Sequence, residues 1–259
     1  MPIADINHAR LNYQLEGRAD APVLVLSNSL GTGLAMWDLQ MPRFLEHFRV
    51  LRHDARGHGQ SQVTPGPYTI AQLAEDVIGL MDHLQIGRAH FCGLSMGGMI
   101  GMWLGAHQPS RIERLVLANT AARIPPPEAW NVRIDKVNLA GMAPIVDGVV
   151  ERWFTADFAA REPQQIEKAR AMLQHTVPAG YVANCAAVRD MDQRDGLGAI
   201  RAPTLVIAGS HDKATPAHDG QFLAEQIAGA RFLELDAAHL SNWEQADQFT
   251  AAVVDFLTA

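Results

Sequence analysis

The feature that most constrains this chain is an apolar run that ends in a Gly-x-Ser-x-Gly pattern. The run extends from Arg88 to Cys92, the pattern from Gly93 to Gly97, and small and apolar residues continue to Ala106. A strand, a tight turn and a helix in succession form the context in which such a pattern presents a reactive serine hydroxyl. Ser95 is therefore predicted to lie at the tip of the turn, beside glycines that let neighbouring backbone pass close. On this pattern alone, a plain glycine-rich turn is the alternative.

Apolar runs with strand character recur along the chain and alternate with helical patterns. The runs are Val23–Leu26, Val50–Leu51, Leu115–Leu117, Thr204–Ala208 and Arg231–Leu235. Helices are expected over Trp37–Leu45, over Ile70–Leu84, whose apolar residues share one face, and over Trp243–Leu257. The alternation of Ile6 to Glu16 is typical of an antiparallel hairpin at a sheet edge. Together these patterns predict an α/β fold with a mostly parallel, doubly wound sheet.

The middle of the chain departs from this alternation. Three consecutive prolines begin at Pro125, and no strand signal follows until after Arg194. Four helical stretches are expected there, over Glu128–Leu139, Ala143–Phe154, Pro163–Thr176 and Ala179–Met191. An all-helical insert of this kind would cover the carboxyl ends of the strands, where open α/β sheets bind ligands. We therefore expect a core domain formed by residues 1–122 and 196–259, with a helical cap over residues 123–195.

Charge and composition exclude several classes of function. The net charge is −7, spread without runs, so the sequence has no basic region for nucleic acid or an anionic membrane. Neither a signal peptide nor a membrane-spanning stretch is visible, which favours a cytoplasmic protein. Cys92 and Cys185 lack the spacing of a metal site and are expected to be buried, reduced thiols.

Two further residues at strand ends complete a candidate catalytic triad with Ser95. A serine hydroxyl needs a base to take its proton and a third group to orient that base. Asp212 follows one buried strand and His239 follows the next, so the order is Ser, Asp, His and all three residues are expected on one edge of the sheet. His211 is a rival for the base, and Asp219 and Asp236 are weaker rivals for the acid.

Backbone N–H groups are expected to hold the oxyanion that forms during acyl transfer. The residue after the nucleophile, Met96, begins a helix and has a free N–H, and the Leu30 N–H in the loop Ser27–Gly33 is the second candidate. The loop Asp54–Ser61 is also rich in polar residues. There, however, we expect Asp54, Arg56 and His58 to satisfy their own loop's backbone rather than to act in catalysis.

At these residues the chain resembles the α/β-hydrolase fold superfamily, and within it the family of 3-oxoadipate enol-lactonases. The resemblance rests on Asn28–Thr32, Asp54–Ser61, Gly93–Gly98, the pair Trp130 and Arg133, and Gly209 with Asp212. It implies hydrolysis of 3-oxoadipate enol-lactone to 3-oxoadipate, in the β-ketoadipate pathway that degrades protocatechuate and catechol, and it implies neither cofactor nor metal. At Asn28-Ser29 the chain departs from the His-Gly found in many members of the superfamily. This difference lies in the loop that carries the Leu30 N–H, so the pattern supports Leu30 as an oxyanion donor less directly than it supports Met96.

An anionic lactone would need a cation inside the pocket, because the overall charge of the chain repels it. Arg133 is the candidate. It lies three residues after Trp130 on an expected helix, so the indole could wall the ring while the guanidinium binds the carboxylate. The alternative places Arg133 on a solvated face and Trp130 in the core of the cap. Trp153 is expected to pack within the cap.

Other functions on the same fold stay open. A carboxylesterase, or a hydrolase of carbon–carbon bonds in a ring-cleavage product, would keep the triad and change the cap. A ligand receptor with this fold would keep the pocket without hydrolysing anything. The oligomeric state and the motion of the cap leave no signal in the sequence.

Overall fold

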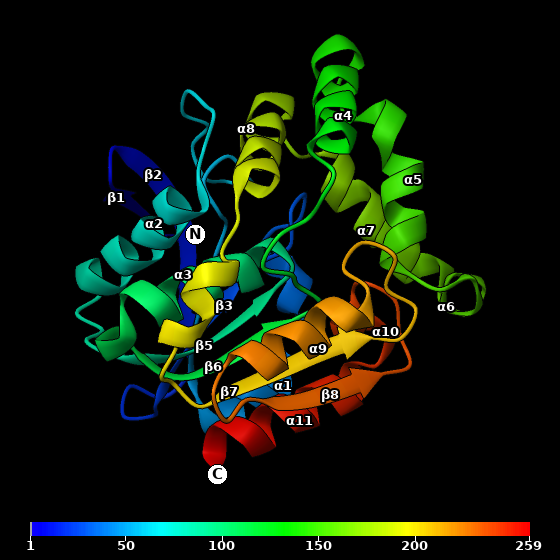
Figure 1. The fold of residues 1–259 in the computed structure, drawn as a ribbon. Coiled ribbons are helices and arrows are strands. Elements are labelled where there is room, and N and C mark those ends of the chain that lie inside the picture. Colours follow the sequence, from blue (N-terminus) through cyan, green and yellow to red (C-terminus); the bar gives the residue numbers. More distant parts are fainter. Residues whose placement is uncertain (1) are drawn as a thin grey trace.

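The computed structural model describes residues 2–259, and its centre is one sheet of eight strands (Figure 1). The strand order is β1-β2-β4-β3-β5-β6-β7-β8. The strands are β1 Ile3–Ile6, β2 Ala9–Glu16, β3 Val23–Ser27, β4 Arg49–His53, β5 Ala89–Leu94, β6 Ile112–Ala118, β7 Thr204–Gly209 and β8 Arg231–Leu235. From β4 to β8 every neighbouring pair is parallel, and only β2 pairs antiparallel, with β1 and β4. The predicted mostly parallel sheet is confirmed.

Burial of the strands follows their position in the sheet. Every residue of β5 and β7 is buried, as expected for central strands with helices on both faces. At one edge, β1 alternates exposed and buried residues and pairs with β2 in a hairpin. At the other edge, β8 is largely exposed. The continuous apolar runs in the sequence therefore mark the strands at the centre.

Two groups of helices cover the two faces of the sheet. One face carries α1 (Met41–His47) and α11 (Ala246–Thr258), which contact each other. The other carries α2 (Ile70–His83), α3 (Met96–His107), α9 (Ala217–Gln226) and the short 3₁₀ helix η3 (Arg194–Ala199). The remaining short helices are η1 Leu34–Trp37, η2 Pro109–Arg111 and α10 Ser241–Glu244.

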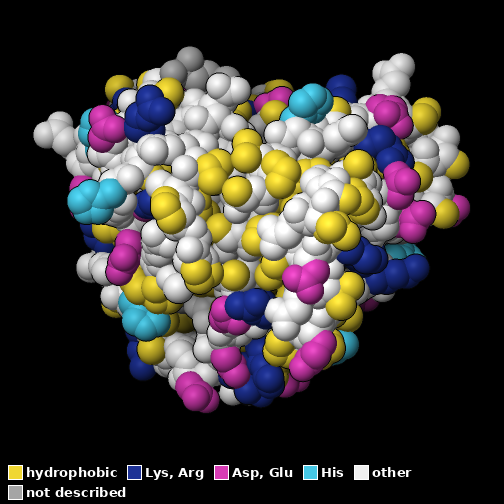
Figure 2. Space-filling view, turned by 90° about the horizontal axis from the view of Figure 1, so that it is seen from above, with side chains coloured by type: hydrophobic (Ala, Val, Ile, Leu, Met, Phe, Trp, Pro, Cys, Tyr) yellow, Lys and Arg dark blue, Asp and Glu magenta, His cyan; other side chains and the backbone are white. Residues whose placement is uncertain are grey.

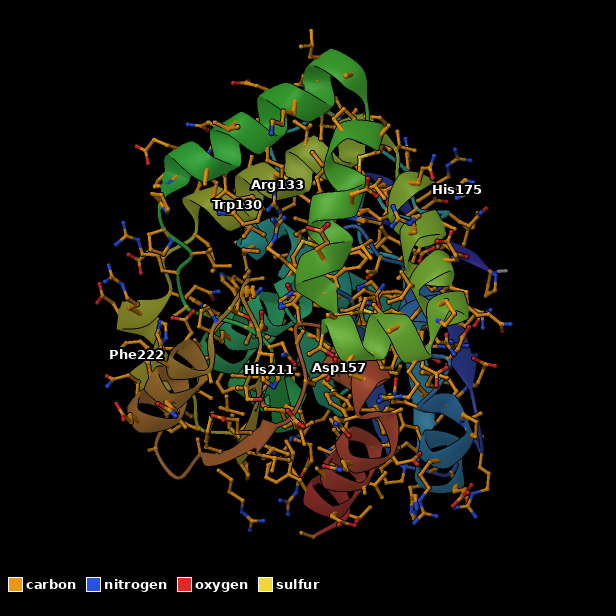
Figure 3. The ribbon with its side chains drawn as sticks, turned by 90° about the vertical axis from the view of Figure 1, so that its right-hand side faces the viewer. Trp130, Arg133, Asp157, His175, His211 and Phe222 are labelled. Carbon is orange, nitrogen blue, oxygen red and sulfur yellow. The ribbon has the colours of Figure 1, made fainter. Side chains whose placement is uncertain are left out.

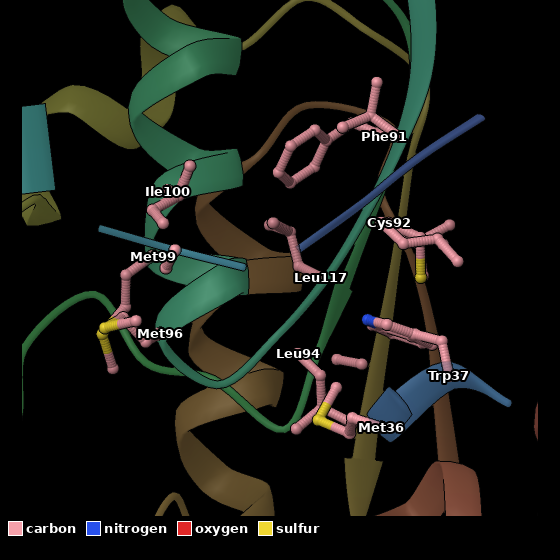
Figure 4. Packing of buried hydrophobic residues seen from close by; sticks show 14 of the residues in the cluster. Met36, Trp37, Phe91, Cys92, Leu94, Met96, Met99, Ile100 and Leu117 are labelled. Atoms are coloured by element: carbon pink, nitrogen blue, oxygen red, sulfur yellow. The ribbon is translucent and has the colours of Figure 1, made fainter. Parts of the chain in front are cut away.

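Helix α3 packs on β5 within the apolar core. Phe91 of β5 and Leu117 of β6 lie on the α3 side of the sheet with Ile100, whereas Cys92 and Leu94 lie on the opposite side of β5 (Figure 4). All five side chains are fully buried. The turn between β5 and α3 is therefore anchored on both sides by close packing.

Five helices between β6 and β7 form a cap above the carboxyl ends of the parallel strands (Figure 1). They are α4 Pro127–Ala140, α5 Ala143–Trp153, α6 Ala156–Arg161, α7 Pro163–Gln174 and α8 Pro178–Asp190. We refer to these five helices as the cap. All of them fall between residues 123 and 195, while the division of the chain into core and cap domains at those bounds stays a prediction.

Three helical elements differ from the sequence expectation. The cap has one helix more than predicted, because α6 has six residues and is too short to show a period. The expected helix Trp37–Leu45 is two elements, since η1 ends at Trp37 and α1 starts only at Met41. The closing helix is likewise divided at Gln245 into α10 and α11.

Hydrogen bonds join the cap to the loops beneath it. The Leu240 N–H donates to the Trp153 carbonyl at 3.0 Å, and the Tyr68 N–H donates to the Ala183 carbonyl at 3.1 Å. The Asn184 side chain donates to the Arg56 carbonyl at 2.8 Å. None of the helices between residues 2 and 259 combines the length and apolar character that a membrane crossing requires.

Candidate active site

Ser95 lies in the sharp turn between β5 and α3. Its φ of 59° and ψ of −117° place a residue with a side chain in a strained region of backbone conformation. The turn is held by its neighbours, because the Ser95 N–H donates to the Ala118 carbonyl at 2.9 Å and the Ser95 carbonyl accepts from Thr120 Oγ1 at 2.8 Å. The packed ends of β5, β6 and α3 thus maintain the strain.

Glycines flank Ser95 because the backbone of the turn leaves no room for side chains. A Cβ atom at Gly93 would lie 2.1 Å from the Gly97 carbonyl oxygen, and one at Gly97 would lie 2.1 Å from the Ser27 carbonyl oxygen. A Cβ atom at Gly98 would lie 2.6 Å from the side-chain Cβ of Thr120. The predicted close approach of backbone at this turn is what the structure has.

His239 and Asp212 are brought together from two loops at the same edge of the sheet. Nδ1 of His239 lies 2.8 Å from Oδ2 of Asp212, and both residues are buried. Asp212 follows β7 and His239 follows β8, so the parallel pairing of these strands makes the loops neighbours. The carboxylate therefore fixes the orientation of the imidazole and directs its Nε2 away from Asp212.

Several donors keep the Asp212 carboxylate in place. Oδ1 accepts from the N–H groups of Ala214 and Thr215, and Oδ2 accepts from Thr215 Oγ1 and from Asn119 Nδ2. Burial alone raises the pKa of Asp212, but the charge and hydrogen bond of His239, together with the bonds from Thr215, outweigh it and hold this pKa below its usual value. Asp212 is therefore an ionised partner for His239.

One cavity of about 270 Å³ lies between the core and the cap. Ser95 and His239 line it from the core, together with Ser29 and Leu30, and the cap helices supply most of the opposite wall. Among residues 2–259 no hydrogen bond joins the Ser95 hydroxyl to His239. Such bonds are often long in unliganded enzymes and tighten when substrate binds.

Two N–H groups near Ser95 are left without an acceptor. Within residues 2–259 neither the Leu30 N–H nor the Met96 N–H has a hydrogen-bond partner. Their neighbours are engaged, because the Gly31 N–H donates to Nε2 of His58 and the Gly97 N–H donates to the Asn28 carbonyl. Leu30 and Met96 thus supply the two free donors beside the nucleophile position.

Asn28, the departure noted in this loop, has a structural function. Its Nδ2 donates to the His53 carbonyl at 2.7 Å, and its Oδ1 accepts from Trp37 Nε1 at 2.9 Å. The amide therefore ties the loop to β4 and η1, and Leu30 remains at the cavity wall.

The cavity contains cations, and none of its lining residues among the described residues 2–259 is acidic. Arg133 and Arg152 project from α4 and α5 of the cap, Lys213 adjoins Asp212, and neither arginine forms a salt bridge within residues 2–259. Burial lowers the pKa of Arg152, and the charge of Arg133 lowers it further. Two guanidinium groups so close together, without a carboxylate, favour the binding of an anion.

The surface above the cavity has a different charge pattern. Seen from the cap side, apolar side chains extend across the middle, while Lys, Arg, Asp and Glu are interspersed around the margins (Figure 2). This face therefore shows no broad basic area. The positive charge that could select an anion is inside the pocket.

Trp130 and Arg133 lie next to each other on the inner side of α4 (Figure 3). The Arg133 guanidinium carbon is 4.6 Å from the centre of the Trp130 ring, within the range of a cation–π contact, and both residues line the cavity. The alternative of a solvated Arg133 does not match this position. Trp153, expected to pack within the cap, is buried but also lines the cavity.

Sequence reasoning missed Arg152 and Lys213 as lining residues. Arg152 follows Glu151 on α5, and this pair of charges is typical of a solvated helix face. Lys213 immediately follows Asp212, and this position next to a triad residue could have indicated that it lies near the site. The neighbouring residues do not, however, determine where the side chain of an exposed lysine points.

The rival residues lie elsewhere. His211 is exposed, and its Nε2 lies 2.8 Å from Asp236 Oδ1 at the surface, apart from Trp130 and Arg133 (Figure 3). Asp219 is half-buried on α9, and burial raises its pKa. Among residues 2–259 no three His, Cys, Asp or Glu side chains are grouped so that they could hold a metal ion.

Comparison with known proteins places this site in a family. Residues 22–246 match the model of the alpha/beta hydrolase fold family. The chain is 45% identical over 243 residues to 3-oxoadipate enol-lactonase 2 of Acinetobacter baylyi, which covers 94% of this chain and 91% of that protein. 3-Oxoadipate enol-lactonase 1 of the same organism is 41% identical over 239 residues, or 92% of this chain and 90% of that protein.

A solved structure agrees with these relatives. The crystal structure of the enol-lactonase from Burkholderia xenovorans matches with a TM-score of 0.98 and 52% identity, and it covers 100% of both chains. The family match, the relatives and the fold all lead to one assignment. This chain belongs to the alpha/beta hydrolase fold family.

Proposed function

We propose that this chain hydrolyses 3-oxoadipate enol-lactone to 3-oxoadipate through an acyl-enzyme on Ser95. One observation carries the proposal: a small cavity joins Ser95 and His239 to two arginines that have no carboxylate partner among residues 2–259. The similarity to named 3-oxoadipate enol-lactonases over nearly the whole chain supports the same substrate.

The size and charge of the cavity suit this lactone. A volume of about 270 Å³ is at the small end for ligand sites, so it favours a compact molecule over a long-chain ester. The lactone carries one carboxylate, and Arg133 and Arg152 can bind it from the cap side. Trp130, stacked on Arg133, would then lie against the ring.

In the proposed acylation, His239 takes the proton of the Ser95 hydroxyl as the serine oxygen attacks the lactone carbonyl. Asp212 holds the imidazole in the required tautomer and stabilises the imidazolium that forms. The N–H groups of Leu30 and Met96 bind the oxyanion of the tetrahedral intermediate. Preorganised donors of this type act without reorganising during the reaction.

The ring oxygen is the leaving group, and its chemistry makes the opening effectively irreversible. The carbon–oxygen bond breaks, the leaving enol oxygen takes the proton from the His239 imidazolium, the enol becomes a ketone, and the acyl chain stays attached to Ser95. Because a ketone oxygen is a poor nucleophile, the ring does not close again. Water, deprotonated by His239, then attacks the acyl-enzyme and releases the diacid.

The proposal includes a place in metabolism and a cellular location. Opening of this lactone is a late step in the degradation of protocatechuate and catechol, where a soluble, cytoplasmic enzyme would act. Cys92 and Cys185 are both free and buried, which fits a reducing compartment.

The direct test follows the loss of enol-lactone absorbance with the purified chain and with Ser95→Ala. We expect rapid loss with the wild type and none above background with the variant. Ser210→Ala, an exposed serine at the end of β7, is the matched control and should retain full activity. Intact-mass analysis after treatment with an organophosphonate should show one adduct, lost in Ser95→Ala.

The outcomes separate the alternatives. If simple aryl esters are hydrolysed while the lactone is not, the protein is a carboxylesterase of this fold. If the phosphonate does not label Ser95 and neither substrate reacts, the ligand-receptor interpretation replaces the enzyme.

A further inference from the structure

His58 contacts the loop Ser27–Gly33, which carries the Leu30 N–H, but does not line the cavity. Its Nε2 accepts the Gly31 N–H at 2.8 Å, and its side chain is almost completely buried. Gly31 has a φ of 81° and belongs to a turn closed by the Thr32 N–H on the Ser29 carbonyl. In such a turn consecutive N–H groups point in different directions, so the position of the Gly31 N–H determines where the Leu30 N–H points.

The imidazole of His58 is held in the tautomer that accepts this bond. Nε2 must be unprotonated to accept, so the proton of the neutral ring is on Nδ1. The Asn184 amide, 3.3 Å from Nδ1, already donates to the carbonyls of Arg56 and Gly180 at 2.8 Å. Burial lowers the pKa of His58 to about 4, so the ring is neutral near neutral pH.

We propose that His58 is a positioning residue for the oxyanion hole: by accepting the Gly31 N–H it holds the Leu30 N–H free and directed at the tetrahedral intermediate. This inference rests on the proposed acyl transfer at Ser95. It assigns a mechanistic function to the Asp54–Ser61 loop, whose histidine does not line the cavity.

The cap holds the same turn from the other side. Thr176 Oγ1 lies 3.3 Å from the Gly31 carbonyl and 3.2 Å from the Met172 carbonyl, and its one proton is shared between them. A Cβ at Gly31 would lie 2.5 Å from Leu173 Cδ1 and 3.1 Å from Tyr181 Cε2. The cap also reaches His58, because Asn184 of α8 contacts its ring. His58 and Thr176 thus hold Gly31 at its N–H and its carbonyl, one from the core and one from the cap.

The test compares three variants on 4-nitrophenyl acetate, an activated ester that needs only acyl transfer. His58→Phe keeps a buried ring and removes the acceptor, so kcat should fall at least about tenfold, and up to the 10²-fold typical of a lost oxyanion donor, with KM within threefold. His58→Gln carries an acceptor oxygen near the Nε2 position and should restore most of kcat. His90→Phe, a buried histidine whose Nδ1 has no partner, is the matched control and should leave kcat unchanged.

Binding of an alkylboronic acid separates positioning from general damage to the fold. Its tetrahedral adduct on serine places an oxygen in the oxyanion hole, whereas acetate binds as a ground-state carboxylate. In His58→Phe the affinity for the boronic acid should fall in parallel with kcat/KM, while the inhibition constant of acetate should stay within twofold of the wild-type value. Equal weakening of both ligands, or an unchanged kcat in a folded His58→Phe, overturns the proposal.

A second variant covers the case in which His58→Phe does not fold. Thr176→Val removes the bond to the Gly31 carbonyl from the cap side and should lower kcat in the same way, with a smaller effect. If the wild type hydrolyses 4-nitrophenyl acetate but not the enol-lactone, the proposed substrate fails and the His58 inference stands. An unchanged kcat in Thr176→Val, with boronate binding equal to that of the wild type, contradicts it.

Discussion

Nδ1 of His239 and Oδ2 of Asp212 lie 2.8 Å apart although 27 positions separate them in the sequence. The bond forms because β7 and β8 are parallel neighbours whose carboxyl ends open at one edge of the sheet. Replacing the carboxylate by an amide should keep the shape of the site but prevent His239 from accepting the Ser95 proton. The amide can donate to Nδ1 and so favours the wrong tautomer of the imidazole.

Asp212→Asn is therefore expected to lower kcat for the enol-lactone by about 10³- to 10⁴-fold with little change in KM. Steady-state kinetics give the value, and far-ultraviolet circular dichroism checks the fold. Asp236→Asn, at the exposed partner of His211, is the control and should behave as wild type. A loss of similar size in Asp236→Asn would point to the rival pair instead.

Arg133→Ala and Arg152→Ala should each raise KM for the anionic lactone by about 10- to 100-fold, the usual effect of losing a charged hydrogen bond. Because neither group touches the reacting bond in the proposed mechanism, kcat should change little. Hydrolysis of neutral 4-nitrophenyl acetate should be unaffected by either change. Arg161 is a cap arginine that lies outside this cavity, so Arg161→Ala should change the KM of neither substrate. An unchanged KM for the lactone in both pocket variants would show that Arg133 and Arg152 do not bind its carboxylate.

Asn119 joins the loops that carry Asp212 and His239. Its Nδ2 donates to Asp212 Oδ2 at 3.1 Å and to the Ala238 carbonyl at 3.2 Å, and its Oδ1 accepts from Ser241 at 2.6 Å. We expect Asn119→Ala to lower kcat about tenfold, since loss of these bonds loosens the orientation of the imidazole. Ser241→Ala removes only one bond and should give a smaller decrease; activity equal to wild type in both would show that the loops hold without this amide.

Gly97→Ala tests the crowding at the turn. The added Cβ would lie 2.1 Å from the Ser27 carbonyl oxygen, so we expect a loss of about 3 kcal/mol in the free energy of unfolding and most of the activity. Gly148→Ala is the matched control within α5, where a Cβ meets nothing within 4 Å. It should stabilise the helix by about 0.5 to 1 kcal/mol. Urea denaturation measures both, and equal effects would contradict the steric account.

Buried His58 should make stability depend on pH. Its pKa is lowered to about 4 from an ordinary value of 6.5, because burial disfavours the charged ring. Between these values the unfolded chain binds a proton that the folded chain does not, so the free energy of unfolding falls as the pH falls from about 6.5 to about 4. The full contribution is about 3 kcal/mol.

His58→Gln carries no such group and isolates this contribution from His53 and His90, whose pKa values are also lowered by burial. Between pH 7 and pH 5, the wild type should lose about 2 kcal/mol more of its unfolding free energy than the variant does. Urea denaturation at the two pH values gives the difference. An equal loss in both proteins would mean that His58 is not buried as a neutral ring.

Much of the fold and the reactive serine could be predicted from local patterns. Continuous apolar runs mark strands buried on both faces, and the glycines around Ser95 mark a turn where backbone passes close to backbone. Because parallel strands share one edge for their carboxyl ends, positions after β7 and β8 predicted that Asp212 and His239 would meet. Short elements such as α6 were not predicted because a helix of six residues is too short to show a period.

The sequence by itself determined the strand and helix pattern, the strained turn at Ser95 and the order of the three polar strand ends. Only the tertiary structure decided that Arg152 lines the same cavity as Arg133 and that His58 accepts the Gly31 N–H. The physical reason is that sequence patterns report only on residues close together along the chain. Periodicity reports burial along one element, whereas these contacts depend on how the cap helices and the loops of the core pack against one another.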